Sequence, residues 1–154
     1  MAKKKKTLAP PSYGEVCFSL RYVIPERKLS VHIVEAKDLK AMDKSGLSDP
    51  YVKVTLIAFQ KSLAKKKTRV IKETLNPFFN KTLVFDVPFD KINELTMVVA
   101  VTEWNKLKNK PIGEVVLNHD VTGSGREHWK DMFAHPQKPV VMWHKLSAPD
   151  MSKS

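Results

Sequence analysis

Residues 15–22 read Glu-Val-Cys-Phe-Ser-Leu-Arg-Tyr, with a large apolar side chain at every second position. Successive side chains of a β-strand point to opposite faces, so this alternation is typical of a strand with one buried face. Val16, Phe18, Leu20 and Tyr22 are therefore predicted to form the buried face of the first strand.

The same two-residue period returns along the rest of the chain. It predicts further strands over residues 29–33, 52–56, 83–87, 95–101, 115–117 and 140–146, together with a lysine-rich strand that ends near Val70. Short strands separated by turn residues favour an all-β fold. We therefore predict an eight-stranded antiparallel β-sandwich.

One segment has a different period. Ser124 and Glu127 have the spacing of a capping box, in which each side chain bonds a free backbone N–H at the start of a helix. Trp129, Met132 and Phe133 follow at helical spacing. We therefore predict a short helix between the last two strands.

The length of 154 residues is ordinary for one domain. Residues 1–13 are basic and then proline-containing, which predicts a flexible arm or linker. Residues 14–148 contain the alternating segments and are predicted to form the folded domain, and residues 149–154 a disordered tail.

The composition and the absence of certain motifs limit the kinds of function that the chain could have. A formal net charge of +11 predicts affinity for anionic partners. The single cysteine, Cys17, excludes an intramolecular disulfide and a multi-cysteine metal site. No apolar run approaches the roughly 18–20 residues that a membrane-spanning helix needs, and no secretory signal follows the lysines of residues 3–6. Since the sequence has no zinc spacing, phosphate-binding glycine loop or nucleophile turn, we expect a binding protein and not an enzyme.

The densest charge feature lies between Pro50 and Lys72, a stretch without acidic residues. Its cations are Lys53, Lys61, Lys65, Lys66, Lys67, Arg69 and Lys72. Because the surrounding pattern predicts β-structure, these cations would be displayed on a rigid sheet. Each basic residue near an anionic membrane contributes about 1 kcal/mol, screened by salt, which suffices for reversible recruitment. The alternative is a solvated face with no fixed partner.

Several motifs resemble those of C2 domains. They are Ser48-Asp49-Pro50-Tyr51-Val52-Lys53, residues 74–80 (Thr-Leu-Asn-Pro-Phe-Phe-Asn) and Ile112-Gly113. Residues 14–20, the lysine-rich strand, residues 127–132 and residues 143–146 narrow the resemblance to the second, membrane-distal C2 domain of synaptotagmins. The resemblance implies a sandwich with loops at one end that bind Ca²⁺ and insert into phospholipid. It also implies that the polybasic strand binds phosphoinositides and the acidic surfaces of SNARE or other trafficking proteins.

The resemblance also indicates where calcium ligands would lie, and several are altered. Asp43 and Asp49 match aspartates of the first loop, whereas Glu103, Asn105 and Lys110 replace aspartates of the third loop. Calcium takes 6–8 oxygen ligands, several of them carboxylate. We therefore expect no calcium cofactor at physiological concentrations. A weak residual site formed by Asp43, Asp49 and Glu103 is the alternative.

Two further regions bear on membrane contact. Trp104 and Leu107, at the tip of the third loop, could enter a bilayer without calcium, or Trp104 could be packed within the loop. After the helix, the arginine pair of the family is replaced by Gln137 and Lys138. Because lysine lacks the bidentate fork of arginine, membrane bridging through this region is expected to be weaker.

These features support a main hypothesis and two alternatives. The main hypothesis is a calcium-independent module that binds anionic phosphoinositide membranes or fusion-machinery proteins in vesicle trafficking and exocytosis. The alternatives are a calcium-dependent phospholipid-binding exocytosis sensor, and a nucleic-acid-binding domain. Specific nucleic-acid binding is disfavoured because no aromatic side chains are interleaved with the lysines for base stacking. We expect location at the cytoplasmic side of a vesicle or plasma membrane, with any transmembrane segment of the parent protein outside this chain.

Overall fold

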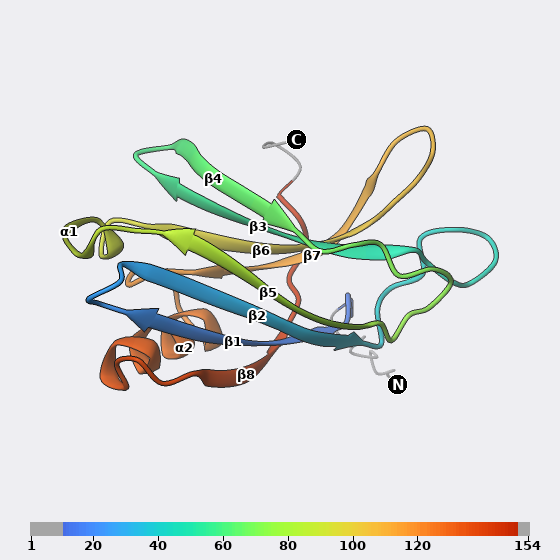
Figure 1. The fold of residues 1–154 in the computed structure, drawn as a ribbon. Helices are drawn as coiled ribbons and strands as arrows, with labels where there is room; N and C mark the ends of the chain where they lie inside the picture. Colours follow the sequence, from blue (N-terminus) through green and yellow to red (C-terminus); the bar gives the residue numbers. More distant parts are fainter. Residues whose placement is uncertain (1–10, 151–154) are drawn as a thin grey trace, which may run out of the picture.

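In the computed structural model, which describes residues 11–150, the chain forms two four-stranded antiparallel sheets packed face to face (Figure 1). The strands are β1 (Glu15–Val23), β2 (Lys28–Lys37), β3 (Pro50–Ala58), β4 (Lys61–Lys67), β5 (Phe78–Asp86), β6 (Thr96–Glu103), β7 (Lys110–Leu117) and β8 (Val140–Lys145). One sheet has the order β5-β2-β1-β8 and the other β4-β3-β6-β7. The predicted eight-stranded sandwich is confirmed. Most of the predicted arm (1–13) and tail (149–154) lies outside the described residues.

The core lies between the two sheets and follows the predicted alternation. Val16, Phe18 and Leu20 of β1 are fully buried, as are Val52 and Val54 of β3. The side chains at the intervening positions of each strand point to the outer faces of the sandwich. The apolar period of the sequence thus defines one continuous core.

The helix predicted between the last two strands is present as α2 (Ser124–Ala134). Its Trp129 and Met132 are buried. The helix α2 lies close to β7 at Gly125, where an added Cβ atom would be 2.1 Å from the carbonyl oxygen of Val116. A second helix, α1 (Phe89–Ile92), joins β5 to β6. A helix of four residues is too short to show a helical period in the sequence.

The predicted capping box is wrong. Gly123 occupies the N-cap position of α2, and no side chain caps the helix there. The hydroxyl of Ser124 instead lies 2.7 Å from Nδ1 of the buried His144. A buried imidazole nitrogen without a partner is more costly than an exposed helix terminus, whose N–H groups water can satisfy. The hydroxyl of Ser124 therefore bonds a buried side chain and does not cap the helix.

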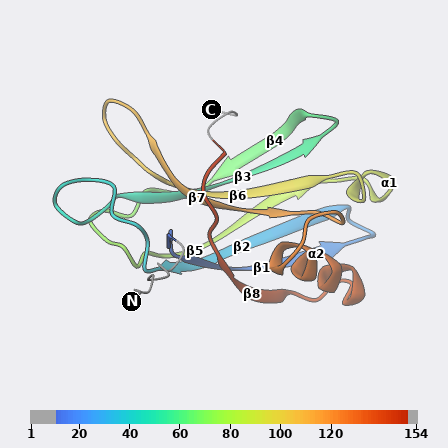
Figure 2. The ribbon, with the colours of Figure 1, turned by 180° about the vertical axis from the view of Figure 1, so that it is seen from behind.

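The connections fall at two ends of the sandwich (Figures 1 and 2). We call one the loop end, which comprises connections 38–49, 68–77 and 104–109. The other is the hairpin end, which comprises the turns 24–27 and 59–60, connection 87–95 and connection 118–139 with α2. β3 runs between the two ends over nine residues, a length of about 30 Å. Side chains at one end therefore do not contact those at the other.

Candidate functional site

The lysine-rich strand is β4, which forms an edge of its sheet. It ends at Lys67 and not near Val70, as the sequence pattern had suggested. Lysines on an edge strand also prevent sheets from pairing with one another, so their presence alone does not identify a binding site. The arrangement of their side chains is therefore the relevant observation.

The lysines of β4 divide between two faces of the sheet. Lys67 pairs with Lys53 and Lys65 with Thr55, whereas Lys66 pairs with the buried Val54. Paired residues of an antiparallel ladder point to the same side. Lys53, Lys65 and Lys67 consequently share the outer face, which we call the lysine face, and Lys66 points to the inner side.

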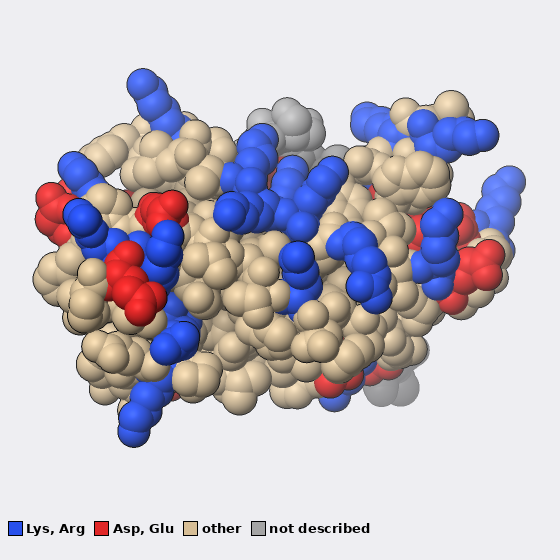
Figure 3. All heavy atoms as spheres, in the orientation of Figure 1, with Lys and Arg blue, Asp and Glu red and all other residues tan. Residues whose placement is uncertain are grey.

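The lysine face forms a compact basic surface. Figure 3 shows blue side chains gathered over β4 and its surroundings with no acidic side chain among them. The Nζ atom of Lys67 lies 5.6 Å from the ring centroid of Tyr51, which belongs to the same face. A cation over an aromatic ring is weakly stabilised without being neutralised. This face therefore keeps its charge available for an anionic partner.

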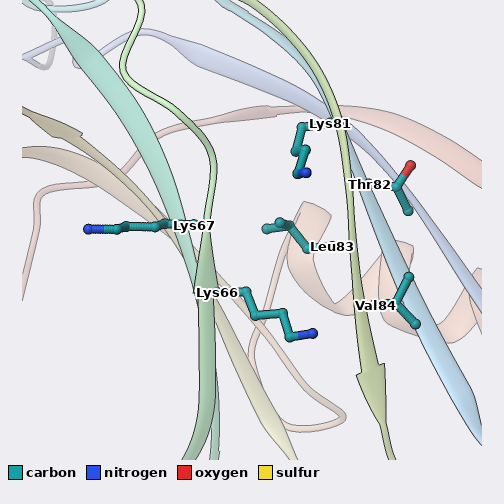
Figure 4. A pocket seen from close by; sticks show the side chains of 6 residues that line it. All are labelled: Lys66, Lys67, Lys81, Thr82, Leu83 and Val84. Carbon is teal, nitrogen blue, oxygen red and sulfur yellow. The ribbon is translucent and has the colours of Figure 1, made fainter.

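A second basic feature is a groove of about 500 Å³ between the edge strands β4 and β5, which we call the edge groove. It is lined by Lys66, Lys67, Lys81, Thr82, Leu83 and Val84. In Figure 4 the side chain of Lys66 extends into the groove, whereas that of Lys67 extends away from it. Lys81 was not singled out in the sequence. The feature that could have identified it is its position two residues before the core residue Leu83, which places both on the inner face of an edge strand.

The other predicted basic residues lie apart from the lysine face. Lys61 begins β4 at the hairpin end, and Arg69 follows β4 towards the loop end. Lys138 follows α2 at the hairpin end, where its N–H donates to the carbonyl of His135. The structure thus does not bring the predicted lipid-binding residues into one patch.

Trp104 lies at the loop end, on the third loop, and is partly exposed. The Nζ atom of Lys72 lies 5.1 Å from its ring centroid. The neighbouring Leu107 is 92% exposed. Trp104 is therefore covered on one side by the second loop, and Leu107 is the apolar side chain that projects from this tip.

The predicted carboxylates do meet at the loop end. Glu103 pairs with Pro50, next to Asp49, and its side chain is only 2% exposed. Burial raises the pKa of Glu103, and the nearby charge of Asp43 raises it further. Its Oε1 atom has no hydrogen-bond partner. The hydrogen bond from the Ser45 hydroxyl is the main cause that lowers the pKa of Asp43.

Two further side-chain oxygens at the loop end accept backbone N–H groups of the loops. Asp49 Oδ1 accepts the backbone N–H of Glu73 at 2.7 Å. Asn105 Oδ1 accepts the N–H groups of Leu107 and Lys108, at 2.9 and 3.3 Å. An oxygen that closes a loop is not free to turn towards a metal ion without breaking these bonds.

In this arrangement few oxygens of the cluster are free for a calcium ion. Calcium needs 6–8 converging oxygens, and here one carboxylate is buried, one holds a backbone N–H, and the positive charge of Lys110 lies close enough to lower the pKa of Glu103. Within residues 11–150, no set of three or more His, Cys, Asp or Glu side chains is arranged to hold a metal ion.

The fold and these surfaces define a class: a β-sandwich domain with a basic edge and clustered loops at one end. The chain belongs to the C2 domain family, whose family model matches residues 27–132. In the part of the chain that the structure describes, no helix has the length and apolar character needed to cross a bilayer.

Related proteins support this assignment. The chain is 49% identical to human synaptotagmin-2 over 138 residues, which are 89% of this chain and 33% of that protein. It is 48% identical to synaptotagmin-1 of Aplysia californica over 134 residues, 86% of this chain and 31% of that protein. The chain thus spans about a third of the length of these relatives. The RIM C2A domain from Drosophila has the same fold, with a TM-score of 0.70 at 24% identity, covering 89% of this chain and 100% of that one.

Proposed function

We propose that this chain is a calcium-independent membrane-binding module that acts in vesicle trafficking or exocytosis. Its ligands are anionic phosphoinositide membranes and the acidic surfaces of SNARE or other trafficking proteins, met at the cytoplasmic face of a vesicle or plasma membrane. The observation that carries this proposal is the lysine face, a set of cations on a rigid sheet edge with no acidic residue in the same stretch of sequence. The similarity to synaptotagmins supports the trafficking context.

Electrostatics set the strength of this binding. The lysine face and Lys66 together hold four cations on two adjacent strands. At about 1 kcal/mol for each lysine near an anionic membrane, they would strengthen binding by roughly 4 kcal/mol, or about a thousandfold. At physiological ionic strength, salt screens the attraction between exposed charges that are more than a Debye length, about 8 Å, apart. The proposed attachment is therefore reversible and sensitive to ionic strength.

Calcium independence is supported by the state of the loop end. The buried Glu103 and the engaged Asp49 leave Asp43 as the most accessible carboxylate of the cluster. The specific observation that favours the calcium-dependent alternative is Oε1 of Glu103, which has no hydrogen-bond partner and lies near the charge of Asp43. A single buried oxygen supplies a small part of the coordination that calcium requires.

Charge reversal tests the proposed surface. We expect the double variant Lys66→Glu, Lys67→Glu to lose binding to vesicles that contain phosphatidylinositol bisphosphate, because it reverses charge on both sides of β4. Both side chains are exposed, so the melting temperature should change little. Co-sedimentation equal to that of the wild-type protein would remove the basis of the proposal.

A further inference from the structure

The turn of the β3–β4 hairpin carries a large exposed aromatic residue. Phe59, at its tip, is 79% exposed. Leu63, four residues further on, is 59% exposed. A single exposed apolar residue is ordinary, but two large ones at the tip of one hairpin form a local apolar surface.

Phe59 is also unfavourable for the turn that it occupies. Phe59 and Gln60 have φ angles of 51° and 66°, as in a type I′ turn, which favours Asn-Gly because both residues need positive φ. A bulky aromatic residue is rare in this region of φ and ψ. Phe59 thus costs stability both in its backbone conformation and in its exposure to water, which indicates a role outside folding.

A β-bulge determines the position of Leu63. Leu56 pairs with Ala64 and Ile57 with Ser62, so Leu63 has no partner in the ladder. A bulge twists the strand locally and changes the direction of the side chain. Leu63 is therefore released from the regular alternation of β4 close to the tip that Phe59 occupies.

The charges on the same hairpin indicate what this apolar tip meets. Lys61 lies between Phe59 and Leu63 in the sequence, and the lysine face begins at Lys65. From Pro50 to Lys72 the chain has no acidic residue. An anionic bilayer presents negative headgroups directly above hydrocarbon, and so it complements cations that flank an apolar tip.

We propose that the β3–β4 hairpin enters an anionic lipid bilayer, with Phe59 and Leu63 at the boundary between headgroups and acyl chains and the lysines against the headgroups. This inference rests on the proposed membrane binding and adds the residues that insert. It places the hairpin end, and not the loop end, at the bilayer. The two ends are separated by the length of β3, so they can be tested independently.

The first test separates binding from folding. In Phe59→Asn the turn receives a residue that tolerates positive φ, so the melting temperature should stay the same or rise. Affinity for vesicles of phosphatidylcholine, phosphatidylserine and phosphatidylinositol bisphosphate should fall about tenfold, because the buried ring is lost. Unchanged affinity would overturn the proposal. The proposal would also be overturned if Phe59→Asn kept its affinity for vesicles but lost binding to an acidic peptide or an oligonucleotide. The hairpin would then bind that partner and not the bilayer.

The second test locates the inserted end. Phe59→Trp and the matched variant Leu107→Trp each place a tryptophan at an exposed tip, and the signal of the native tryptophans is subtracted with the wild-type protein. Lipids brominated near the headgroup should quench Phe59→Trp strongly and Leu107→Trp weakly. Equal quenching, or quenching of Leu107→Trp alone, would overturn the assignment to the hairpin end. If both variants bind without quenching at position 59, insertion fails while the proposed function stands; if neither variant nor the wild-type protein binds, both fail.

Discussion

The Nζ atom of Lys66 lies 5.7 Å from the ring centroid of Phe85, on the opposite sheet. Its sequence neighbour Lys67 points to the other side of β4, over Tyr51. One continuous run of lysines in the sequence therefore forms two surfaces, the lysine face and the edge groove. A membrane that lies flat against the outer face of the β4-β3-β6-β7 sheet contacts the lysine face more closely than the edge groove.

Paired alanine substitutions can distinguish these surfaces. The variant Lys65→Ala, Lys67→Ala removes two cations from the lysine face, and Lys66→Ala, Lys81→Ala removes two from the edge groove. We expect the first to weaken vesicle binding by about 2 kcal/mol, or roughly thirtyfold. The second, which has the same net charge, should weaken it less. Equal losses, measured by co-sedimentation at one salt concentration, would show that net charge alone determines binding.

Glu103→Gln should stabilise the protein. The raised pKa of Glu103 means that its charged form is disfavoured in the folded state, so stability is lost as the pH rises from about 4.5, its value in the unfolded chain, through the folded pKa. An amide removes this charge, and its N–H₂ group can donate to Asp43. We expect a gain of about 1 kcal/mol at neutral pH in the presence of chelator, measured by urea unfolding. A calcium ligand would behave differently, since its loss would lower stability when calcium is present.

Two buried histidines join α2 to β8 through a hydrogen-bonded chain. A carbonyl oxygen can only accept, so Nε2 of His128 donates to Val140 at 2.6 Å. Nε2 of His144 then donates to Nδ1 of His128, and the hydroxyl of Ser124 donates to Nδ1 of His144, each at 2.7 Å. This chain of donors and acceptors is complete with both rings neutral, the form that the lowered pKa of each ring favours.

This chain predicts a loss of stability in acid. Burial, followed by the charge of His128, lowers the pKa of His144 to about 3. Burial also lowers the pKa of His128, against smaller opposing effects of Val140 and Asp131. Since an unfolded histidine titrates near 6.5, the unfolded state binds more protons below that pH, and stability falls from about pH 6.5 towards pH 3.

For His144 the slope approaches about 1.4 kcal/mol for each pH unit. Urea unfolding between pH 7.5 and 5 measures it, and the difference between the wild-type protein and His144→Gln removes the contributions of other groups. If the two proteins have parallel pH profiles, His144 is not the group responsible.

Gly125→Ala should prevent α2 from docking. The added methyl group would lie 2.1 Å from a backbone oxygen of β7, which cannot move aside without distorting the sheet. We expect a destabilisation of more than about 3 kcal/mol, in the range of severe core substitutions. The matched control is Gly123→Ala, whose Cβ atom would meet nothing within 4 Å. That variant should lose less, from positive φ alone, and equal melting temperatures for the two variants would contradict this account.

The sequence predicted the fold well because its core signals are periodic. The alternation at Val16, Phe18 and Leu20 depends only on strand geometry, and the helical spacing of Trp129 and Met132 only on helix geometry. Features that arise from tertiary contacts could not be predicted in this way. The capping box failed because His144, twenty residues away, competes for the hydroxyl of Ser124.

The candidate site was predicted only in part. The run of lysines and the residue types of the three loops can be read directly from the sequence. The division of Lys66 from Lys67 depends on register with β3, and the edge groove depends on how β4 lies beside β5 in the other sheet. Phe59 was not singled out in the sequence, because its position at the tip of a turn with positive φ is known only from the structure.

Binding to anionic vesicles in the presence and absence of a calcium chelator tests the central claim most directly. Vesicles containing phosphatidylserine and phosphatidylinositol bisphosphate are sedimented with the wild-type protein at physiological ionic strength, with either micromolar calcium or excess chelator. We predict the same bound fraction in both conditions, because the lysine face needs no metal ion. Binding that appears only with calcium, and that Asp43→Asn abolishes, would contradict the account and identify the loop end as a calcium-triggered site.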